Sequence, residues 1–261
     1  MRRSALHSVN CNAGVTKVLF AGYDNDLVLS SQDDGYVNIY SVDGLQFIQG
    51  LHAHGDIASS LSINPTNASQ FLSCGWDGTI NFWDWNSAGI NKPLISISAA
   101  HHKHINDIAY HPMNHSVFCS GGDDGFVRIW DSRAASEVSP SPSPDCINIF
   151  NNQQAVSCVE WSATYPNLVY SGTDDGYIRT FDCRTGSSGG HVLPPQRIHK
   201  GRVRKIRSLP STQIRSPGAI GEVIFSASDD TTVAASALTY ENDVADIVEI
   251  DRYHSNILQL L

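Results

Sequence analysis

The chain has 261 residues, of which 41% are hydrophobic and 16% charged, and its formal net charge is −9. The length fits one large all-β domain as well as two smaller domains. The acidic charge argues against direct binding of nucleic acid, whose phosphates attract an excess of Lys and Arg, and the lack of any run of 18 apolar residues predicts no membrane-spanning helix.

Residues 1–14 are polar, and we expect them to form an irregular N-terminal segment. The basic start, Met1-Arg2-Arg3, is not followed by an apolar stretch, so no secretory signal is expected. The cysteines at positions 11, 74, 119, 146, 158 and 183 show neither a CxxC pair nor zinc-ligand spacing. We therefore expect reduced thiols, a location in the cytoplasm and nucleus, and no metal or cofactor.

The first folded unit shows the pattern that the rest of the chain repeats. Strands are expected at residues 15–20 and 27–30, followed by the turn Asp33-Asp34-Gly35 and an alternating strand at 36–40. An Asp-Gly pair flanked by alternating apolar residues predicts a β-hairpin, because the tight turn needs a positive φ that Gly adopts without steric cost. Residues 45–48 are expected to be the outer strand of this unit.

The same hairpin recurs four more times. Its turn residues, Gly35, Gly78, Gly125, Gly176 and Thr231, are separated by 43, 47, 51 and 55 residues. Repeats of this length with four short strands per unit predict the blades of a β-propeller, which is an all-β fold. The expected units are residues 15–50, 55–98, 104–150, 155–198 and 202–250, and residues 253–261 are expected to start a sixth.

Between the hairpins lie outer strands and loops. Residues 94–97 and 247–250 are expected to be outer strands, and residues 208–221 a loop. Residues 134–145 alternate Ser with Pro, which cannot form a strand ladder, so a loop is expected there too. Its Ser-Pro steps are either candidate phosphorylation sites for a proline-directed kinase or a plain insertion. These candidate sites are Ser139, Ser141 and Ser143.

Two units end in Trp-Asp, at Trp83-Asp84 and Trp130-Asp131, and together with the period these residues resemble the WD-repeat β-propeller family over residues 15–260. The resemblance implies a hydrogen-bonded tetrad of His, Ser, Asp and Trp in each blade, which locks the hairpin to the loop before it. The second and third units match with His54, Ser73, Asp77, Trp83 and with His101, Ser120, Asp124, Trp130.

The other three units depart from this tetrad. The fifth has His199, Ser226 and Asp230 but Ser236 at the Trp position, the fourth has Asn152 and Phe181, and the first has Cys11 and Tyr40. A His-Ser-Asp set could also suggest a hydrolase, but a set that recurs in each repeat is expected to be structural, so no enzyme is predicted. The family typically closes seven blades. Five units and the start of a sixth therefore imply an incomplete ring, either a fragment or a ring with irregular closure.

Two features suggest a surface for a protein partner. Loop residues before the inner strands are candidates for a binding rim around the channel: Asp56, Asn106, Gln154 and Arg202. Residues 197–207 form the one basic run, and alternation places Arg202 and Arg204, with Arg207 as a further candidate, on a patch that either meets an acidic partner or is simply solvated. His101, His102 and His104 could suggest a metal cluster, but His101 already has a place in a tetrad.

Within the family, the chain is most similar to WD-repeat subunits of the methylosome, the complex of the symmetric protein arginine methyltransferase. The similarity lies in residues 13–40, 54–61, 114–120 and 252–254 and in the fifth unit without Trp. It implies a non-enzymatic adaptor that binds the methyltransferase and presents histone or Sm-protein substrates. Rival readings are a nuclear-pore subunit, a peroxisomal import receptor or a ubiquitin-ligase substrate receptor, which share the fold.

Overall fold

The structure of the chain is a computed structural model that describes residues 8–86, 91–134, 145–185, 193–210, 220–241 and 244–254. Twenty strands form five antiparallel sheets of four strands in this part of the chain, and each sheet is built from four consecutive strands. Two short 3₁₀ turns, Asp43–Leu45 and Ser132–Ala134, follow third strands. The all-β class is therefore confirmed.

The strands have the following bounds. The first sheet contains β1 (Val15–Ala21), β2 (Leu27–Gln32), β3 (Tyr36–Ser41) and β4 (Phe47–His52). The second contains β5 (Ala58–Ile63), β6 (Gln70–Gly75), β7 (Ile80–Asp84) and β8 (Ile95–Ile97). The third contains β9 (Ile105–Tyr110), β10 (Val117–Gly122), β11 (Phe126–Asp131) and β12 (Asp145–Asn151). The fourth contains β13 (Val156–Trp161), β14 (Leu168–Thr173), β15 (Tyr177–Asp182) and β16 (Gln196–Arg197). The fifth contains β17 (Val203–Pro210), β18 (Ile220–Ser228), β19 (Thr232–Glu241) and β20 (Val244–His254).

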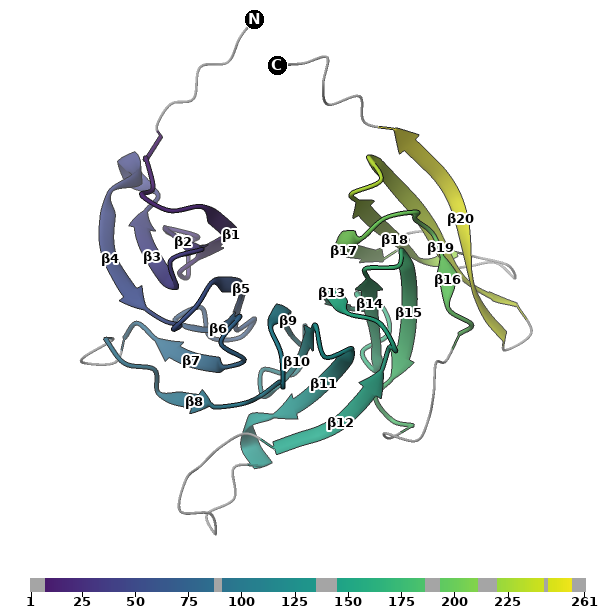
Figure 1. The fold of residues 1–261 in the computed structure, drawn as a ribbon, viewed down its shortest axis with the longest axis horizontal. Coiled ribbons are helices and arrows are strands. Elements are labelled where there is room, and N and C mark those ends of the chain that lie inside the picture. The colour runs from purple at the N-terminus through teal and green to yellow at the C-terminus, as the bar shows by residue number, and fades with distance from the viewer. Residues whose placement is uncertain are drawn as a thin grey trace, which may run out of the picture.

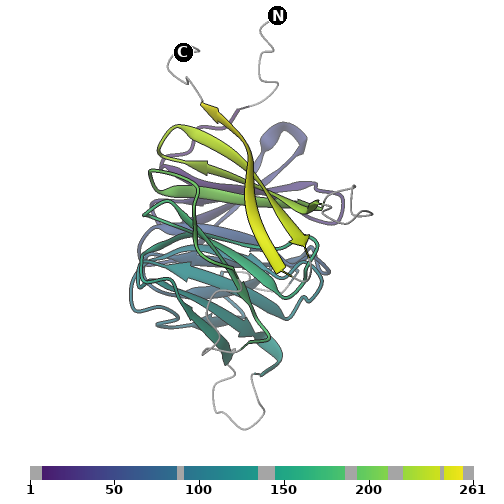
Figure 2. The same ribbon diagram turned by 90° about the vertical axis from the view of Figure 1, so that its right-hand side faces the viewer.

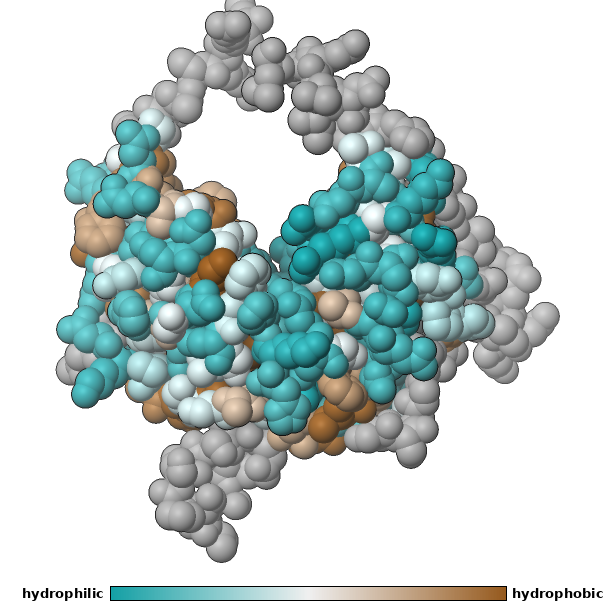
Figure 3. Space-filling model, in the orientation of Figure 1, coloured by the Kyte–Doolittle hydropathy of each residue, from teal (hydrophilic) through white to brown (hydrophobic). Residues whose placement is uncertain are grey.

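The five sheets stand side by side around a central channel, as the blades of a β-propeller do (Figure 1). The first strand of each sheet, which we call its inner strand, lines the channel, and the fourth strand lies on the outside. Seen from the side, β20 crosses the outer edge of the fifth sheet (Figure 2). The arc is open between the first and fifth sheets, and the space-filling view shows this opening, which we call the mouth (Figure 3).

The hairpin turns adopt the backbone conformation that the Asp-Gly pairs predict. Gly35, Gly78, Gly125 and Gly176 have φ between 74° and 83°. A Cβ on Gly35 would lie 2.3 Å from the carbonyl oxygen of His54, so a side chain there would also collide with the next loop. Thr231 adopts a φ of 69° at the fifth turn, a strained conformation for a β-branched residue.

Neighbouring sheets pack face to face through apolar side chains. Leu29 and Val37 of the first sheet form one buried cluster with Leu61, Phe71 and Trp83 of the second. Similar clusters join the second sheet to the third, the third to the fourth and the fourth to the fifth. Each sheet therefore obtains much of its hydrophobic stabilisation from the sheet beside it.

A hydrogen bond recurs at the channel end of each of these interfaces. The side chain of the second residue of an inner strand donates a hydrogen bond to the carbonyl oxygen of the first residue of the next inner strand. The four bonds are Thr16 to Ala58 (2.5 Å), Ser59 to Ile105 (2.5 Å), Asn106 to Val156 (2.8 Å) and Ser157 to Val203 (2.5 Å). This bond fixes the register between neighbouring sheets where their strands are closest.

Three expectations about the strands were wrong. Residues 208–210 and 220–221 belong to β17 and β18 rather than to a loop, because the two strands continue their pairing beyond the usual blade length. The outer strand expected at 45–48 is β4 (Phe47–His52). Tyr253 and His254 do not start a sixth unit but end β20, since they pair with Val233 and Thr232 of the long strand β19.

A matched pair of substitutions tests the sheet packing. Val18 pairs with Ser30 in the first sheet as Leu61 pairs with Ser73 in the second, so the two residues hold equivalent positions. Leu61 is fully buried by the first sheet, whereas Val18 is 53% exposed at the mouth. We expect Leu61→Ala to lower the free energy of unfolding by about 2–5 kcal/mol, and Val18→Ala by less than about 0.5 kcal/mol. Urea denaturation measures both, and equal losses would contradict the open mouth.

Candidate functional site

The tetrad of the second sheet is fully connected. His54 Nε2 lies 2.8 Å from Ser73 Oγ, and Trp83 Nε1 donates to the same oxygen at 3.0 Å. On its other side, His54 Nδ1 lies 3.1 Å from Asp77 Oδ1. His54 and Ser73 are buried, so no substrate can reach the serine oxygen. The set stabilises the blade and has no access for hydrolase chemistry.

The third sheet repeats this arrangement. His101 lies 2.7 Å from Ser120 Oγ and 2.9 Å from Asp124, and Trp130 Nε1 donates to Ser120 at 2.9 Å. Burial lowers the pKa of His101, which favours the neutral ring. Burial acts to raise the pKa of Asp124, but hydrogen bonds from His101 and Arg128 outweigh it and hold that pKa well below its usual range.

The sheets that depart from the tetrad have smaller sets of side-chain contacts in its place. In the fourth sheet Ser171 donates to Asn152 at 2.6 Å. In the first sheet Cys11 Sγ and Tyr40 Oη lie 3.5 Å apart. In the fifth sheet His199 lies 2.8 Å from both Ser226 and Thr232. Thr232 holds the place of Thr79 in the second sheet, whose hydroxyl lies 3.0 Å from His54 Nδ1, so this contact is shared by sheets with and without the Trp.

The four rim candidates do not form one cluster. Asn106 and Arg202 line a cavity at one end of the channel, where Asn106 donates to Asp123 at 2.6 Å. Asp56 and Gln154 are exposed on the loops before β5 and β13, outside the lining of that cavity. The candidate phosphosites Ser139, Ser141 and Ser143 lie outside the described residues.

The arginines of the basic run, residues 197–207, lie in two different places. Arg202 lies 3.1 Å from Asp174, and Arg204 donates to Asp229 at 2.6 Å, both beside the cavity. Arg207 lies further along β17 and pairs with Glu160 at 3.0 Å. The expected patch is therefore formed by Arg202 and Arg204, while Arg207 belongs to a neighbouring ion pair.

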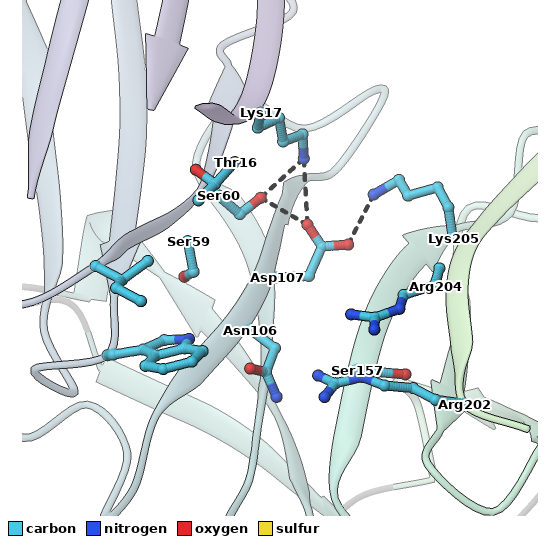
Figure 4. A pocket seen from close by; sticks show the side chains of 12 residues that line it. Thr16, Lys17, Ser59, Ser60, Asn106, Asp107, Ser157, Arg202, Arg204 and Lys205 are labelled. Carbon is cyan, nitrogen blue, oxygen red and sulfur yellow. Dashed lines mark hydrogen bonds and ion pairs between the residues drawn. The ribbon is translucent and has the colours of Figure 1, made fainter. Parts of the chain in front are cut away.

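The centre of the channel holds a residue that the sequence analysis missed, Asp107 of β9 (Figure 4). Its carboxylate lies 3.2 Å from Lys17 Nζ of β1 and 2.7 Å from Lys205 Nζ of β17. It also accepts hydrogen bonds from the Ser60 hydroxyl of β5 at 2.6 Å and from the Val159 amide of β13 at 3.2 Å. One buried carboxylate thus joins all five inner strands, including the two that flank the mouth.

The three charged groups perturb one another. Burial acts to raise the pKa of Asp107, but the charges of Lys17 and Lys205 outweigh it and keep that pKa well below its usual range. At Lys17 burial outweighs the attraction of Asp107 and lowers the pKa. At Lys205 the carboxylate outweighs burial and raises the pKa, because this lysine is 33% exposed at its side chain and is less desolvated.

The cavity around this centre has a volume of about 370 Å³ and takes side chains from all five inner strands or the loops before them. Arg202 and Arg204 point into it from the fifth sheet (Figure 4). Trp76 of the second sheet also lines the cavity; it is 38% exposed and stacks on His104, with ring centroids 4.6 Å apart and planes at 7°. The cavity thus combines a cationic wall with one flat aromatic surface.

Metal and membrane features can be assessed for the same part of the chain. The six cysteines are free thiols, and no group of three or more His, Cys, Asp or Glu side chains among the described residues is arranged to hold a metal ion. His101 is in its tetrad and His104 pairs with Asp123 at 3.2 Å, so the predicted alternative of a histidine cluster is not formed by them. None of the helical segments described is long and apolar enough to span a bilayer.

Substitution of Asp107 tests its central role. We expect Asp107→Asn to cost about 3 kcal/mol at pH 7, because two lysines then face each other without a carboxylate. The folded-state pKa of Asp107 is lowered, so its stabilisation is complete above the unfolded-state pKa of about 4 and is lost as the pH falls further. The difference between variant and parent should therefore shrink below about pH 4. Urea denaturation at several pH values, with exposed Asp56→Asn as control, would contradict this if the difference were constant or absent.

Comparison with known families supports the prediction that the chain contains WD repeats. The sequence profile of the WD domain, G-beta repeat family (WD40) matches residues 45–84, 91–131 and 144–182. Each matched stretch runs from the outer strand of one sheet to the third strand of the next, so it contains the loop that joins two blades, and the first two stretches also contain a complete tetrad.

Curated relatives match over short stretches. WD repeat-containing protein 75 of Mus musculus is 40% identical over 50 residues, which are 19% of this chain and 6% of that protein. The protein of the same name from Danio rerio is 28% identical over 99 residues, or 36% of this chain and 12% of that protein. The chain thus matches only a small part of the length of these relatives. They give no support to the expected likeness to methylosome subunits, which stays a prediction.

A solved structure shares the fold across nearly the whole chain. It is the β-propeller domain of Myceliophteria thermophila Cps50 (Swd1), with a TM-score of 0.73 at 15% sequence identity. The match covers 96% of this chain and 74% of that chain. Together with the five sheets, this shows that the chain has an all-β β-propeller fold, in which three repeats match the WD40 family.

Proposed function

We propose that the chain is a protein-interaction scaffold that receives an acidic segment of a partner at the cationic end of its channel. WD40 propellers generally act as scaffolds for protein partners, and this is the broad class in which the fold places the chain. The observation that carries the narrower proposal is the cavity beside Asp107, in a protein whose formal net charge is −9.

The charges of this cavity leave capacity for an anion. Its four cationic side chains, Lys17, Arg202, Arg204 and Lys205, share three carboxylates, because Asp107 serves both lysines. Arg202 Nε lies buried 3.1 Å from Asp174 without an aligned hydrogen bond to any described residue, so this guanidinium is held by charge rather than by a formed hydrogen bond at that nitrogen. Guanidinium groups bind carboxylates through two parallel hydrogen bonds, which suits Asp or Glu side chains of a peptide.

The sequence resemblance favours a protein arginine methyltransferase as the partner, with histones or Sm proteins as substrates of the complex. A cationic cavity repels arginine-rich segments, so in this proposal it would hold the enzyme or another acidic protein and the substrates would bind elsewhere. A nuclear-pore, peroxisomal import or ubiquitin-ligase role remains the alternative and would use the same cavity for a different acidic protein. A role in the cytoplasm and nucleus fits each of these proposals.

Charge reversal at the cavity tests the proposal. We expect the double variant Arg202→Glu, Arg204→Glu to bind a fluorescent Glu- and Asp-rich peptide at least about tenfold more weakly than the parent chain. Binding by the parent should weaken as salt is added. Arg133→Glu is the matched control, because Arg133 is 65% exposed at its side chain and pairs with Asp131 outside the cavity.

The same three proteins should then be compared for recovery of an arginine methyltransferase from cell lysate. Loss of the enzyme with the double variant alone would support the narrower proposal. Peptide binding that is unchanged by the double variant, or that is insensitive to salt, would contradict the cavity as the recognition site.

A further inference from the structure

The turn after β6 carries a tryptophan where the other four sheets carry an aspartate. In each sheet, the amide of the first residue after the second strand donates to the carbonyl of the residue before an inner strand, over 2.9–3.1 Å. In the second sheet these two residues are Trp76 and Ile57. The residues that hold the place of Trp76 in the other sheets are Asp33, Asp123, Asp174 and Asp229. The internal repeat therefore identifies Trp76 as the exception.

The four aspartates have local partners that a tryptophan cannot replace. Each carboxylate lies against a polar group of an inner strand or of the loop before it. The pairs are Asp33 with the Gly14 amide (2.9 Å), Asp123 with His104 (3.2 Å), Asp174 with Arg202 (3.1 Å) and Asp229 with Arg204 (2.6 Å). An indole has a donor but no acceptor, so Trp76 cannot make this contact. A local departure of this kind in a regular repeat is expected where a side chain serves function rather than the fold.

The indole of Trp76 has a fixed orientation. Its ring stacks on His104 with centroids 4.6 Å apart, and His104 Nδ1 lies 3.2 Å from Asp123. Although His104 covers one face of the ring, Trp76 is still 38% exposed. A ligand that packs on an aromatic surface whose position is already fixed costs little conformational entropy at that surface.

Trp76 lines two cavities. One is the cavity around Asp107, which we call the channel cavity, and Ile57 and Trp76 are the apolar residues of its otherwise polar or charged lining. The other has a volume of about 390 Å³ and lies between the turn after β6 and the loop before β9. The tryptophan is therefore accessible from the channel cavity and has free space beside it.

The charges on the two sides of Trp76 differ. Arg202 and Arg204 point into the channel cavity from the fifth sheet (Figure 4). The second cavity is lined by the carboxylates of Asp77 and Asp123 as well as by Lys103, so it has no excess of positive charge. An acidic residue of a bound segment is therefore drawn to the arginines, and the indole is left for an uncharged side chain.

We propose that the partner segment carries an aromatic residue beside its acidic residues, and that this aromatic ring packs on Trp76 while a neighbouring carboxylate binds Arg202 or Arg204. This inference rests on the proposed function and names the sequence that the channel cavity recognises. Both contacts line one cavity of about 370 Å³, so residues close together in one peptide reach both. Aromatic rings gain from stacked or edge-to-face packing beyond the area they bury. A cationic side chain also packs well on an indole, but the cations of this cavity repel it.

Three fluorescent peptides test the proposal with the full-length chain. They share one run of Asp and Glu and differ only in the residue that follows it, which is Phe, Leu or Ala. We expect the parent chain to bind the Phe peptide at least about tenfold more tightly than the Ala peptide, with the Leu peptide closer to Ala. Fluorescence anisotropy measures the three affinities.

Variants of Trp76 assign the preference to this residue. Trp76→Ala should bind the three peptides about equally and keep the parent's affinity for the Ala peptide within about twofold, whereas Trp76→Phe should keep the preference for Phe. Tyr36→Ala is the matched control, because Tyr36 is 39% exposed, packs on His52 with ring centroids 5.0 Å apart and lies outside the lining of both cavities. This control should leave the preference unchanged.

The same peptides separate this inference from the proposed function. The double variant Arg202→Glu, Arg204→Glu should weaken the binding of all three peptides. If it weakens the Ala peptide while Phe gives the parent no gain, the proposed function stands and the aromatic contact is overturned. If it leaves all three affinities unchanged, both are overturned. A gain from Leu equal to that from Phe, or a preference for Phe that persists in Trp76→Ala, would also overturn the inference.

Photo-crosslinking locates the aromatic residue without any substitution in the chain. A benzophenone amino acid replaces Phe in the peptide, the complex is irradiated, and the joined residues are identified by mass spectrometry. We expect products at Trp76 or at its neighbours Ile57 and His104. Products confined to other parts of the chain would overturn the proposal.

Discussion

Each sheet of this chain is apolar on both faces, and the rest of the structure depends on the packing of one sheet against the next. The second, third and fourth sheets are covered on both sides, and their apolar positions are almost completely buried. A sheet with two apolar faces is not stable alone, so the repeats can fold only as a stack. The side-chain bond to the next inner strand, as from Ser59 to Ile105, then sets the register of the stack.

The functional features follow from this stacking. The third residues of the inner strands hold equivalent positions, four of which line the central cavity, and they differ in charge along the chain. They are Lys17, Ser60, Asp107, Cys158 and Lys205. Asp107 alone carries a negative charge among them, and it binds both lysines, so the two sheets that flank the mouth are tied to the centre although they do not pack on each other. The cationic cavity is the outer part of the same arrangement.

Much of the fold could be predicted from local sequence, because a hairpin turn and a tetrad are encoded within one repeat. The turn at Gly78 and the set of His54 with Ser73 needed no knowledge of the neighbouring sheets. The Asp107 centre could not be found in this way, since its partners Lys17 and Lys205 come from distant strands that meet only when the ring forms. An alignment of the five inner strands would have shown two lysines and one aspartate at a single position. The ends of β17, β18 and β20 were missed because pairing with long neighbours extended them past the usual repeat boundaries.

The central claim is that a sheet is stabilised by the neighbours on its two faces, and native-state hydrogen–deuterium exchange tests it most directly. The second strands β2, β6, β10, β14 and β18 are paired on both edges in their own sheets, so they differ chiefly in whether a neighbour covers each face. We expect slower amide exchange in β6, β10 and β14, which lie in doubly covered sheets, than in β2 and β18 beside the mouth. Equal protection of all five strands, or the greatest protection in β2 and β18, would contradict the account.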